Sequence, residues 1–279
     1  MPEGALRGAL VAFDRLTLSP GWPTFSDVPS ENVLAPDRRT RKRDERRVHL
    51  LDLAAHLVDE QGLPGLTMAA LAEAADYATA SLYTYFHSRS SLVSALQARA
   101  LGVLGEVGEA GLAEWDVALG APADARSRRH AALARLCAFG DVFLAAPEDH
   151  PHEFRLQQEL LASPEGDAGD DGGIVMGAAM AVLDLPRRLL ADAVAAKALV
   201  APSVARNSSG DPVDGDMART LAWVAAMNGV LLLDRLGPVV PLPGFALGRD
   251  LTDTILRGWG APAALLADAR SSSNRWSPR

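Results

Sequence analysis

Residues 66–86 restrict the fold of this chain more than any other segment. Their apolar spacing predicts a short helix, a three-residue turn and a second short helix. In the second helix, Leu82 and Phe86 lie four residues apart and can be buried together, while small and hydroxyl-bearing side chains cover the remaining surface. A short helix with small polar residues at its start fits the DNA major groove, because bulky side chains would prevent close approach. All three tyrosines of the chain lie in this window: Tyr77, Tyr83 and Tyr85.

A longer helix is expected just before this segment. Between residues 47 and 61, apolar side chains recur at the spacing of one buried helical face. Gly62 follows where a left-handed residue commonly ends a helix, and Thr67 stands where an N-cap would begin the next one. Three helices within about forty residues make a minimal helix-turn-helix domain, in which the third helix faces DNA. The apolar positions are Leu50, Leu53, Ala54, Leu57 and Val58.

Residues 37–47 contain seven basic and three acidic side chains, a net charge of +4 in a chain whose total is −8. An isolated basic run is usually solvated and disordered. Here the run leads directly into the predicted helices, so arginines such as Arg41 and Arg43 can lie along DNA phosphates and neutralise them. The rest of the chain is acidic, which keeps most of its surface away from DNA.

Residues 44–100 resemble the DNA-binding domain of the TetR (tetracycline-repressor) family of bacterial transcriptional regulators. The resemblance covers about a fifth of the chain, and its most specific part is the run Leu82-Tyr83-Thr84-Tyr85-Phe86. It is carried by residues 50–52, Gly62, residues 66–68, 71–75, 81–86 and 88–92.

The resemblance implies DNA-binding roles for individual side chains. Thr67 and Tyr83 would donate hydrogen bonds to phosphates, and Thr79 and Ser81 would sit near base edges. Arg89 would meet a phosphate at the start of the fourth helix. The full set of expected DNA-binding residues is Arg41, Arg43, Thr67, Thr79, Ala80, Ser81, Tyr83, Thr84, Tyr85 and Arg89.

Two positions depart from the family pattern. Asp76-Tyr77 occupies the turn where the family usually has Gly-Val. Because aspartate tolerates left-handed backbone geometry at modest cost, the turn is expected to survive. Ala78 stands where a serine or threonine often caps the recognition helix, so we expect Thr79 to act as a substitute cap.

Composition limits the setting in which the protein works. No run approaches the ~20 apolar residues of a membrane-spanning helix. The apolar run at residues 9–13 is too short for a signal peptide, so we expect a cytoplasmic protein with no membrane partner. Cys137 is the one cysteine of the chain and is expected to be a small buried hydrophobic residue.

Helix-forming patterns continue along the rest of the chain, and no alternating strand pattern competes with them. We predict an all-α fold: an N-terminal three-helix helix-turn-helix DNA-binding domain, followed by a helical ligand-binding and dimerisation domain. Pro186 should split or kink the helix that contains it. The expected divisions are a disordered extension at 1–36, the DNA-binding domain at 37–100 (motif 67–86), the helical domain at 101–260 and a tail at 261–279. The later helices are predicted at 92–119, 123–146, 153–162, 174–199, 216–236 and 248–259.

The helical domain should form a homodimer. Residues 217–233 are apolar around most of a helical circumference, which is typical of a central helix or one pressed on a partner. The family resemblance implies that the last two helices pair with their two-fold mates as a four-helix interface, which matches paired operator half-sites. The expected interface residues are Leu221, Ala225, Leu232, Leu251 and Ile255.

The same domain should also bind a small molecule whose identity the sequence does not reveal. Large apolar and methionine side chains line pockets, but they fill ordinary cores more often. The candidates, each with core packing as the commoner explanation, are Phe139, Phe143, Met176, Met180, Trp223 and Met227.

Two classes of function remain open. One is a DNA-binding transcriptional regulator, a repressor that an apolar ligand releases from a double-stranded DNA operator. The alternative is a helical enzyme or ligand-binding protein whose N-terminal domain only resembles a DNA reader. The sequence contains no phosphate-binding loop, nucleophile elbow or metalloprotease histidine pair, so we expect no catalytic residues and no cofactor. His150 and His152 flank a proline and more often form a solvated turn than a metal site, so no metal is expected.

Overall fold

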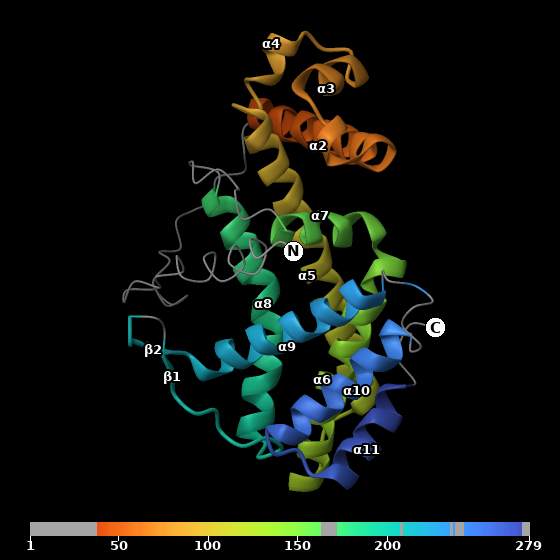
Figure 1. The fold of residues 1–279 in the computed structure, drawn as a ribbon, viewed down its shortest axis with the longest axis vertical. Helices are drawn as coiled ribbons and strands as arrows, with labels where there is room; N and C mark the ends of the chain where they lie inside the picture. The colour runs from red at the N-terminus through yellow and green to blue at the C-terminus, as the bar shows by residue number, and fades with distance from the viewer. Residues whose placement is uncertain (1–37, 163–171, 207–208, 235–236, 238–242, 275–279) are drawn as a thin grey trace, which may run out of the picture. The chain divides into compact units, whose positions relative to one another are not determined.

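The computed structural model describes residues 38–162, 172–206, 209–234, 237 and 243–274. The proline-rich segment at 1–36, expected to be a disordered extension, lies outside these residues. Helices dominate the regular structure (Figure 1), which confirms the all-α prediction. The helices are α2 (Arg38–Gly65), α3 (Met68–Ala74), α4 (Thr79–Leu82), α5 (Arg89–Leu119), α6 (Ala125–Asp149), α7 (Pro151–Ala162), α8 (Gly172–Ala195), α9 (Gly215–Asp234), α10 (Gly244–Gly258) and α11 (Ala263–Ser273). Two short strands, β1 (Ala205–Arg206) and β2 (Pro212–Val213), pair antiparallel between α8 and α9.

The chain divides into two compact units, and the divisions fall inside α5, α7 and α8. The described residues of the first unit are 38–97, 158–162 and 172–175. Those of the second unit are 98–157, 176–206, 209–234, 237 and 243–274.

In the first unit, α2 packs on α3, and α3 packs on α4. The buried face of α2 follows the predicted spacing except that Leu51 is buried and Leu53 is only half-buried. The sequence predicts a helix start at Arg47, whereas α2 begins at Arg38, so the basic segment is part of the helix. Gly62 has a φ of +71° and interrupts α2, as the left-handed ending predicts.

Two further predictions of local geometry are confirmed in this unit. The hydroxyl oxygen of Thr67 accepts a hydrogen bond of 3.0 Å from the Ala70 amide and caps α3. Asp76 has a φ of +56°, so the aspartate does adopt the left-handed conformation that the turn requires. The turn therefore survives without the glycine that the family usually has there.

In the second unit, α9, α10 and α11 all pack against α6. Close approach is possible because a Cβ atom on Gly248 of α10 would lie 2.4 Å from the Leu144 side chain of α6. Pro186 lies inside α8, which is a single helix, so of the two expected outcomes, a split or a kink, the split does not occur. Cys137 is buried on α6, as predicted, and burial raises the pKa of its thiol to about 12.

An ion cluster fixes α11 to the body of the second unit. The Asp141 side chain on α6 has no exposed surface, and Arg270 of α11 lies 2.9 Å from its carboxylate. Arg249 of α10 lies 3.2 Å from the same carboxylate, and Arg270 also pairs with Asp253. A buried carboxylate needs such partners, because desolvation of an unpaired charge costs several kcal/mol. Residues 261–279, expected as a tail, thus include a packed helix.

Candidate nucleic-acid interface and apolar pocket

The segment at residues 79–86, here called the reading segment, turns its apolar side chains inward and its polar ones to solvent. Leu82 and Phe86 are fully buried, whereas 48% of Tyr83 is exposed. Figure 1 shows α4 beside α3, joined by the turn that contains Asp76. The segment therefore presents a surface of small and hydroxyl-bearing side chains. The exposed members of the predicted DNA-binding set in this segment are Thr79, Ala80, Ser81, Tyr83 and Thr84, while Tyr85 is half-buried.

The start of α4 differs from the prediction. Ala78 is the N-cap and makes no side-chain capping bond, so Thr79 is the first helical residue and its predicted role as a substitute cap is wrong. A helix of four residues is not stable by itself. Burial of Leu82 and a 2.7 Å hydrogen bond from the Thr84 hydroxyl to the Ser81 carbonyl hold it in place.

Arginines of α2 hold the end of the reading segment. The Nη2 atom of Arg43 donates a hydrogen bond of 3.0 Å to the carbonyl oxygen of Thr84. The guanidinium carbon of Arg47 lies 5.2 Å from the centre of the Phe86 ring, within the range of a cation–π contact. Both arginines therefore position the reading segment, a role that the sequence did not indicate.

A third arginine of α2 acts on a tyrosine of the same segment. A side-chain hydrogen bond with Tyr85 raises the pKa of the exposed Arg46 guanidinium, and the nearby Tyr77 adds to the shift. Tyr85 is thus engaged within the protein as well as being half-exposed.

Four other basic side chains of α2 remain available for contacts outside the chain. They are exposed, and the described residues include no hydrogen-bond or ion-pair partner for them. The basic segment therefore contains two kinds of residue, those that contact the reading segment and those that face solvent alone. The second kind comprises Arg38, Arg39, Arg41 and Lys42.

Arg89 joins the start of α5 to the turn that precedes α3. Its Nε atom donates to the carbonyl oxygen of Leu66 and its Nη2 atom donates to that of Leu63, both over 2.6 Å. These two bonds use the planar fork of the guanidinium to fix the backbone around Thr67. The phosphate contact expected of Arg89 stays a prediction, and its observed contacts are internal.

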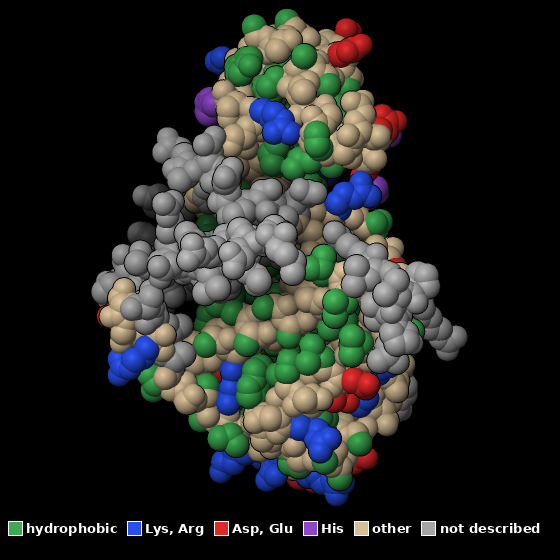
Figure 2. Space-filling model, viewed as in Figure 1, with side chains coloured by type: hydrophobic (Ala, Val, Ile, Leu, Met, Phe, Trp, Pro, Cys, Tyr) green, Lys and Arg blue, Asp and Glu red, His purple; other side chains and the backbone are tan. Residues whose placement is uncertain are grey.

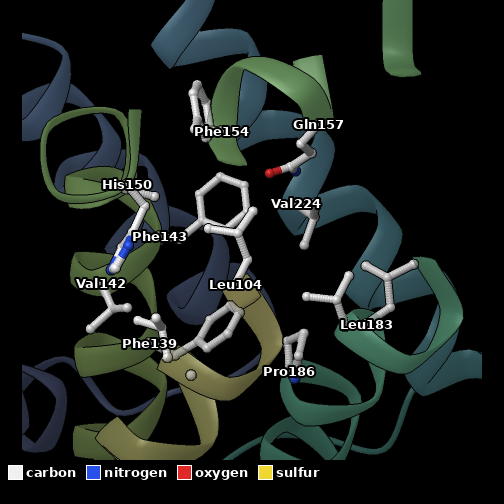
Figure 3. Close-up of a pocket in the computed structure, with 14 residues that line it drawn as sticks. Leu104, Phe139, Val142, Phe143, His150, Phe154, Gln157, Leu183, Pro186 and Val224 are labelled. Carbon is white, nitrogen blue, oxygen red and sulfur yellow. The ribbon is translucent and has the colours of Figure 1, made fainter. Parts of the chain in front are cut away.

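The second unit contains an apolar pocket between α5, α6, α7, α8 and α9 (Figure 3). The cavity has a volume of about 70 Å³, and the empty space reaches about 620 Å³ when the open mouth is included. No charged Asp, Glu, Lys or Arg side chain lines it. The lining residues are Leu104, Val107, Gly108, Phe139, Val142, Phe143, Ala146, His150, Phe154, Gln157, Val182, Leu183, Pro186 and Val224.

Of the predicted pocket residues, Phe139 and Phe143 line this cavity. Trp223 and Met227 are fully buried in the core, where Trp223 donates a 3.2 Å hydrogen bond to the Thr252 hydroxyl. The Trp223 ring lies 5.5 Å from that of Phe139, so it supports the pocket wall from behind.

The two predicted pocket methionines lie elsewhere. Met176 exposes 47% of its surface and Met180 is half-buried, and neither lines the cavity. Sequence reasoning missed Gln157, which follows the buried Phe154 by three residues and so shares its helical face. A polar residue on an apolar face was the signal that could have found it.

The residues predicted for a dimer interface lie on α9 and α10. Leu232 exposes 57% of its surface and Ala225 is exposed, while Leu221 and Leu251 are half-buried. Ile255 packs partly against the core of its own unit. Figure 2 shows hydrophobic side chains gathered over the region of α9 and α10.

Two other kinds of site are absent from the described residues. No group of three His, Cys, Asp or Glu side chains there is placed to hold a metal ion. None of the helices in that part of the chain has both the length and the hydropathy needed to cross a membrane.

Comparison with known proteins adds family and fold. The family model described as bacterial regulatory proteins, tetR family, matches residues 50–96. No curated protein matches the chain. At their low sequence identities, the matching solved structures show a shared fold.

Three solved structures illustrate this likeness. A protein of unknown function from Rhodococcus sp. RHA1 has 22% identity over 76% of this chain and 94% of its own, with a TM-score of 0.56. RolR in complex with resorcinol has 16% identity over 86% of this chain and 99% of its own, with a TM-score of 0.53. SmeT, the repressor of the Stenotrophomonas maltophilia multidrug efflux pump SmeDEF, has 16% identity over 76% of this chain and 89% of its own, with a TM-score of 0.50.

The matched model covers the helix-turn-helix region whose geometry is described above, and the shared fold extends over most of the remaining chain. Regulators of this family act by binding DNA and are generally not enzymes. Residues 50–96 therefore belong to a DNA-binding domain of the kind found in bacterial regulatory proteins of the tetR family, and this domain supports a DNA-binding transcriptional regulator.

Proposed function

We propose that this regulator is a repressor that binds a DNA operator as a homodimer and leaves it when a small apolar molecule fills the pocket. DNA reading is assigned to residues 37–100, and ligand binding and dimerisation to residues 101–260 together with α11. One observation carries the proposal. The reading segment buries Leu82 and Phe86 completely, while its polar side chains other than Tyr85 are exposed.

The exposed side chains suit the two kinds of contact that a DNA reader makes. Thr79 and Ser81 lie in the first turn of α4, where short hydroxyl side chains can approach base edges in the major groove. Tyr83 and Thr67 can donate hydroxyl hydrogens to phosphates, since the capping bond of Thr67 uses its oxygen as an acceptor. The phosphate contacts orient the helix, and the base contacts supply sequence preference.

The free basic residues of α2 supply sequence-independent affinity. Arg38, Arg39, Arg41 and Lys42 are exposed, so they can neutralise phosphates and release counterions. Such a contribution shows as salt dependence and leaves base preference unaffected.

A second copy of the chain is proposed to cover the apolar face of α9. Ala225 and Leu232 are exposed on that helix, and a Cβ atom on Gly229 would meet nothing within 4 Å, so a partner helix could approach closely. A two-fold dimer would place two reading heads on half-sites roughly 34 Å apart, one helical turn of DNA. A single head buries too little surface for specific binding at physiological salt.

Ligand release requires that the ligand prefer the conformation that does not bind DNA. Helix α5 offers a physical link, because one continuous helix supplies Leu104, Val107 and Gly108 to the pocket and begins at Arg89 in the first unit. A ligand that shifts α5 changes the support of the turn that Arg89 fixes. RolR, which has the same fold, is known in complex with resorcinol, and this likeness supports a ligand-binding body.

The proposal is tested with the purified full chain and labelled DNA from upstream of its own reading frame. Anisotropy titrations at salt concentrations between about 50 and 300 mM should show saturable binding. The logarithm of the binding constant should fall linearly with the logarithm of the salt concentration. Random DNA of equal length is the control and should bind at least tenfold more weakly. Equal binding of both duplexes would contradict the assignment.

A further inference from the structure

The pocket in the second unit has a feature that an unselective apolar cavity lacks. Two polar side chains, His150 and Gln157, stand among lining residues that are otherwise apolar or glycine. His150 is the C-cap of α6, and Gln157 lies on α7, directed inward in Figure 3. The described residues include no hydrogen-bond partner for either side chain.

His150 and Gln157 are half-buried in the wall of the pocket, so a ligand that fills it would displace the water that can reach them. A hydrocarbon ligand would then leave an amide and an imidazole without partners, and buried polar groups without partners are costly. A ligand hydroxyl both donates and accepts, so it can satisfy either group whichever way the amide is turned. The pocket therefore favours a ligand that carries at least one hydroxyl over an isosteric hydrocarbon.

The charge of the residues that line the pocket sets a second condition on the ligand. Because no aspartate, glutamate, lysine or arginine lines the pocket, an anionic or cationic ligand would meet no permanent counter-charge there, and burying a lone charge is strongly unfavourable. The ligand must therefore be neutral at pH 7. A phenol meets this condition, since the phenolic side chain of tyrosine has a pKa of about 10.

The walls set a third condition. Phe139, Phe143 and Phe154 supply three aromatic rings, and the Phe139 and Phe143 centres lie 6.4 Å apart with a 43° tilt. Phe139 is backed by Trp223, which the hydrogen bond to Thr252 holds. Fixed tilted rings favour a planar aromatic guest, which can pack in an offset or edge-to-face arrangement.

Together these conditions define one class of molecule. We propose that the pocket binds neutral hydroxylated aromatic compounds, with Gln157 and His150 as the hydrogen-bonding anchors of the hydroxyl groups. The proposal rests on the function assigned to the pocket above and names the chemical class of its ligand.

The test compares three probes of similar size on the full chain by isothermal titration: phenol, toluene and benzoate. Phenol should bind at least tenfold more tightly than toluene, and benzoate should bind no better than toluene. The proposal would be overturned if toluene or benzoate bound as tightly as phenol or more tightly. It would also be overturned if phenol did not bind at millimolar concentration.

Two variants locate the anchors. Gln157→Leu and His150→Phe should each reduce the preference for phenol over toluene by at least threefold, without weakening toluene binding. The matched control is Val182→Ala, which changes the size of the cavity and should alter both affinities together. Unchanged preference in both anchor variants would refute their assigned role.

Operator binding is measured separately on each variant without ligand. If the parent chain fails to bind DNA but keeps its phenol preference, the proposed function fails and the ligand class stands. If operator binding is intact and the phenol preference is absent, the ligand class alone is wrong.

Discussion

Arg43 on α2 donates a 3.0 Å hydrogen bond to the backbone carbonyl of Thr84, at the end of the reading segment. The contact joins residues 41 positions apart in sequence. It turns one arginine of the basic segment into a support for the reading segment, while Arg41 remains exposed and free of such contacts. The position of an arginine along α2 therefore decides whether it supports the reading segment or faces solvent, and composition alone does not distinguish the two.

This separation predicts different salt responses. Arg43→Gln removes the exposed hydrogen bond to the Thr84 carbonyl, so operator affinity should fall about five- to tenfold, the effect of about 1 kcal/mol for one such bond, with little change in salt slope. Arg41→Gln removes a phosphate contact, so the slope of log K against log salt should flatten by about 0.9 while base preference is retained. Anisotropy titrations over a salt series measure both. Identical slopes for the two variants would show that the arginines act alike.

The buried Asp141–Arg270 pair predicts a large effect on stability. Arg270→Ala leaves the Asp141 carboxylate with fewer partners in the core, and breaking a buried pair of this kind costs about 3–5 kcal/mol of unfolding free energy. Arg126→Ala is the control, because its ion pair with Asp268 lies on the surface and is worth under about 1 kcal/mol. Urea unfolding of both variants gives the comparison. A loss for Arg270→Ala no larger than that of the control would show that α11 is not fixed by this cluster.

The buried thiol of Cys137 predicts unusual inertness. Its pKa is raised to about 12 by desolvation, so almost none of it is the reactive thiolate at pH 8. A thiol reagent should modify the native chain at pH 8 at least a hundredfold more slowly than the urea-unfolded chain. Because the neutral form is favoured in the fold, this group's contribution to stability should decline as pH rises from the unfolded value near 9 toward 12. Rapid modification of the folded chain would contradict the buried placement.

The proposed dimer predicts a monomer when the exposed face of α9 is charged. Leu232→Glu places a carboxylate on a side chain that is 57% exposed, so the fold should remain intact while the interface is lost. Ile255 is a poorer probe, because it also packs on the core of its own unit. Val117→Glu changes a residue that is 85% exposed on α5 and should leave the oligomeric state unchanged. Light scattering distinguishes the outcomes, and a dimeric Leu232→Glu variant would exclude this face.

Local backbone features were predictable because nearby residues decide them. Gly62 and Asp76 adopt positive φ values where a helix end and a turn require them, and Thr67 caps α3 through its own hydroxyl. The inward placement of Leu82 and Phe86 follows from their four-residue spacing.

Features that depend on distant partners were not predictable. Whether Trp223 lines the pocket or lies in the core depends on how α9 is rotated relative to Phe139 and Thr252. The residue type alone does not specify this rotation. Helix α11 was missed because its anchor is the ion pair of Arg270 with a carboxylate 129 residues earlier. The supporting role of Arg43 likewise needs the position of the Thr84 carbonyl.

The central claim is that the exposed face of the reading segment binds DNA, and one comparison tests it most directly. Parent and Tyr83→Phe chains are titrated with the upstream duplex and with random DNA at one fixed salt concentration. Loss of a phosphate-donating hydroxyl should weaken binding to both duplexes by a similar factor, about five- to tenfold, because the contact positions the helix without reading sequence. If Tyr83→Phe binds the upstream duplex as tightly as the parent, the reading face has been assigned to the wrong side chains.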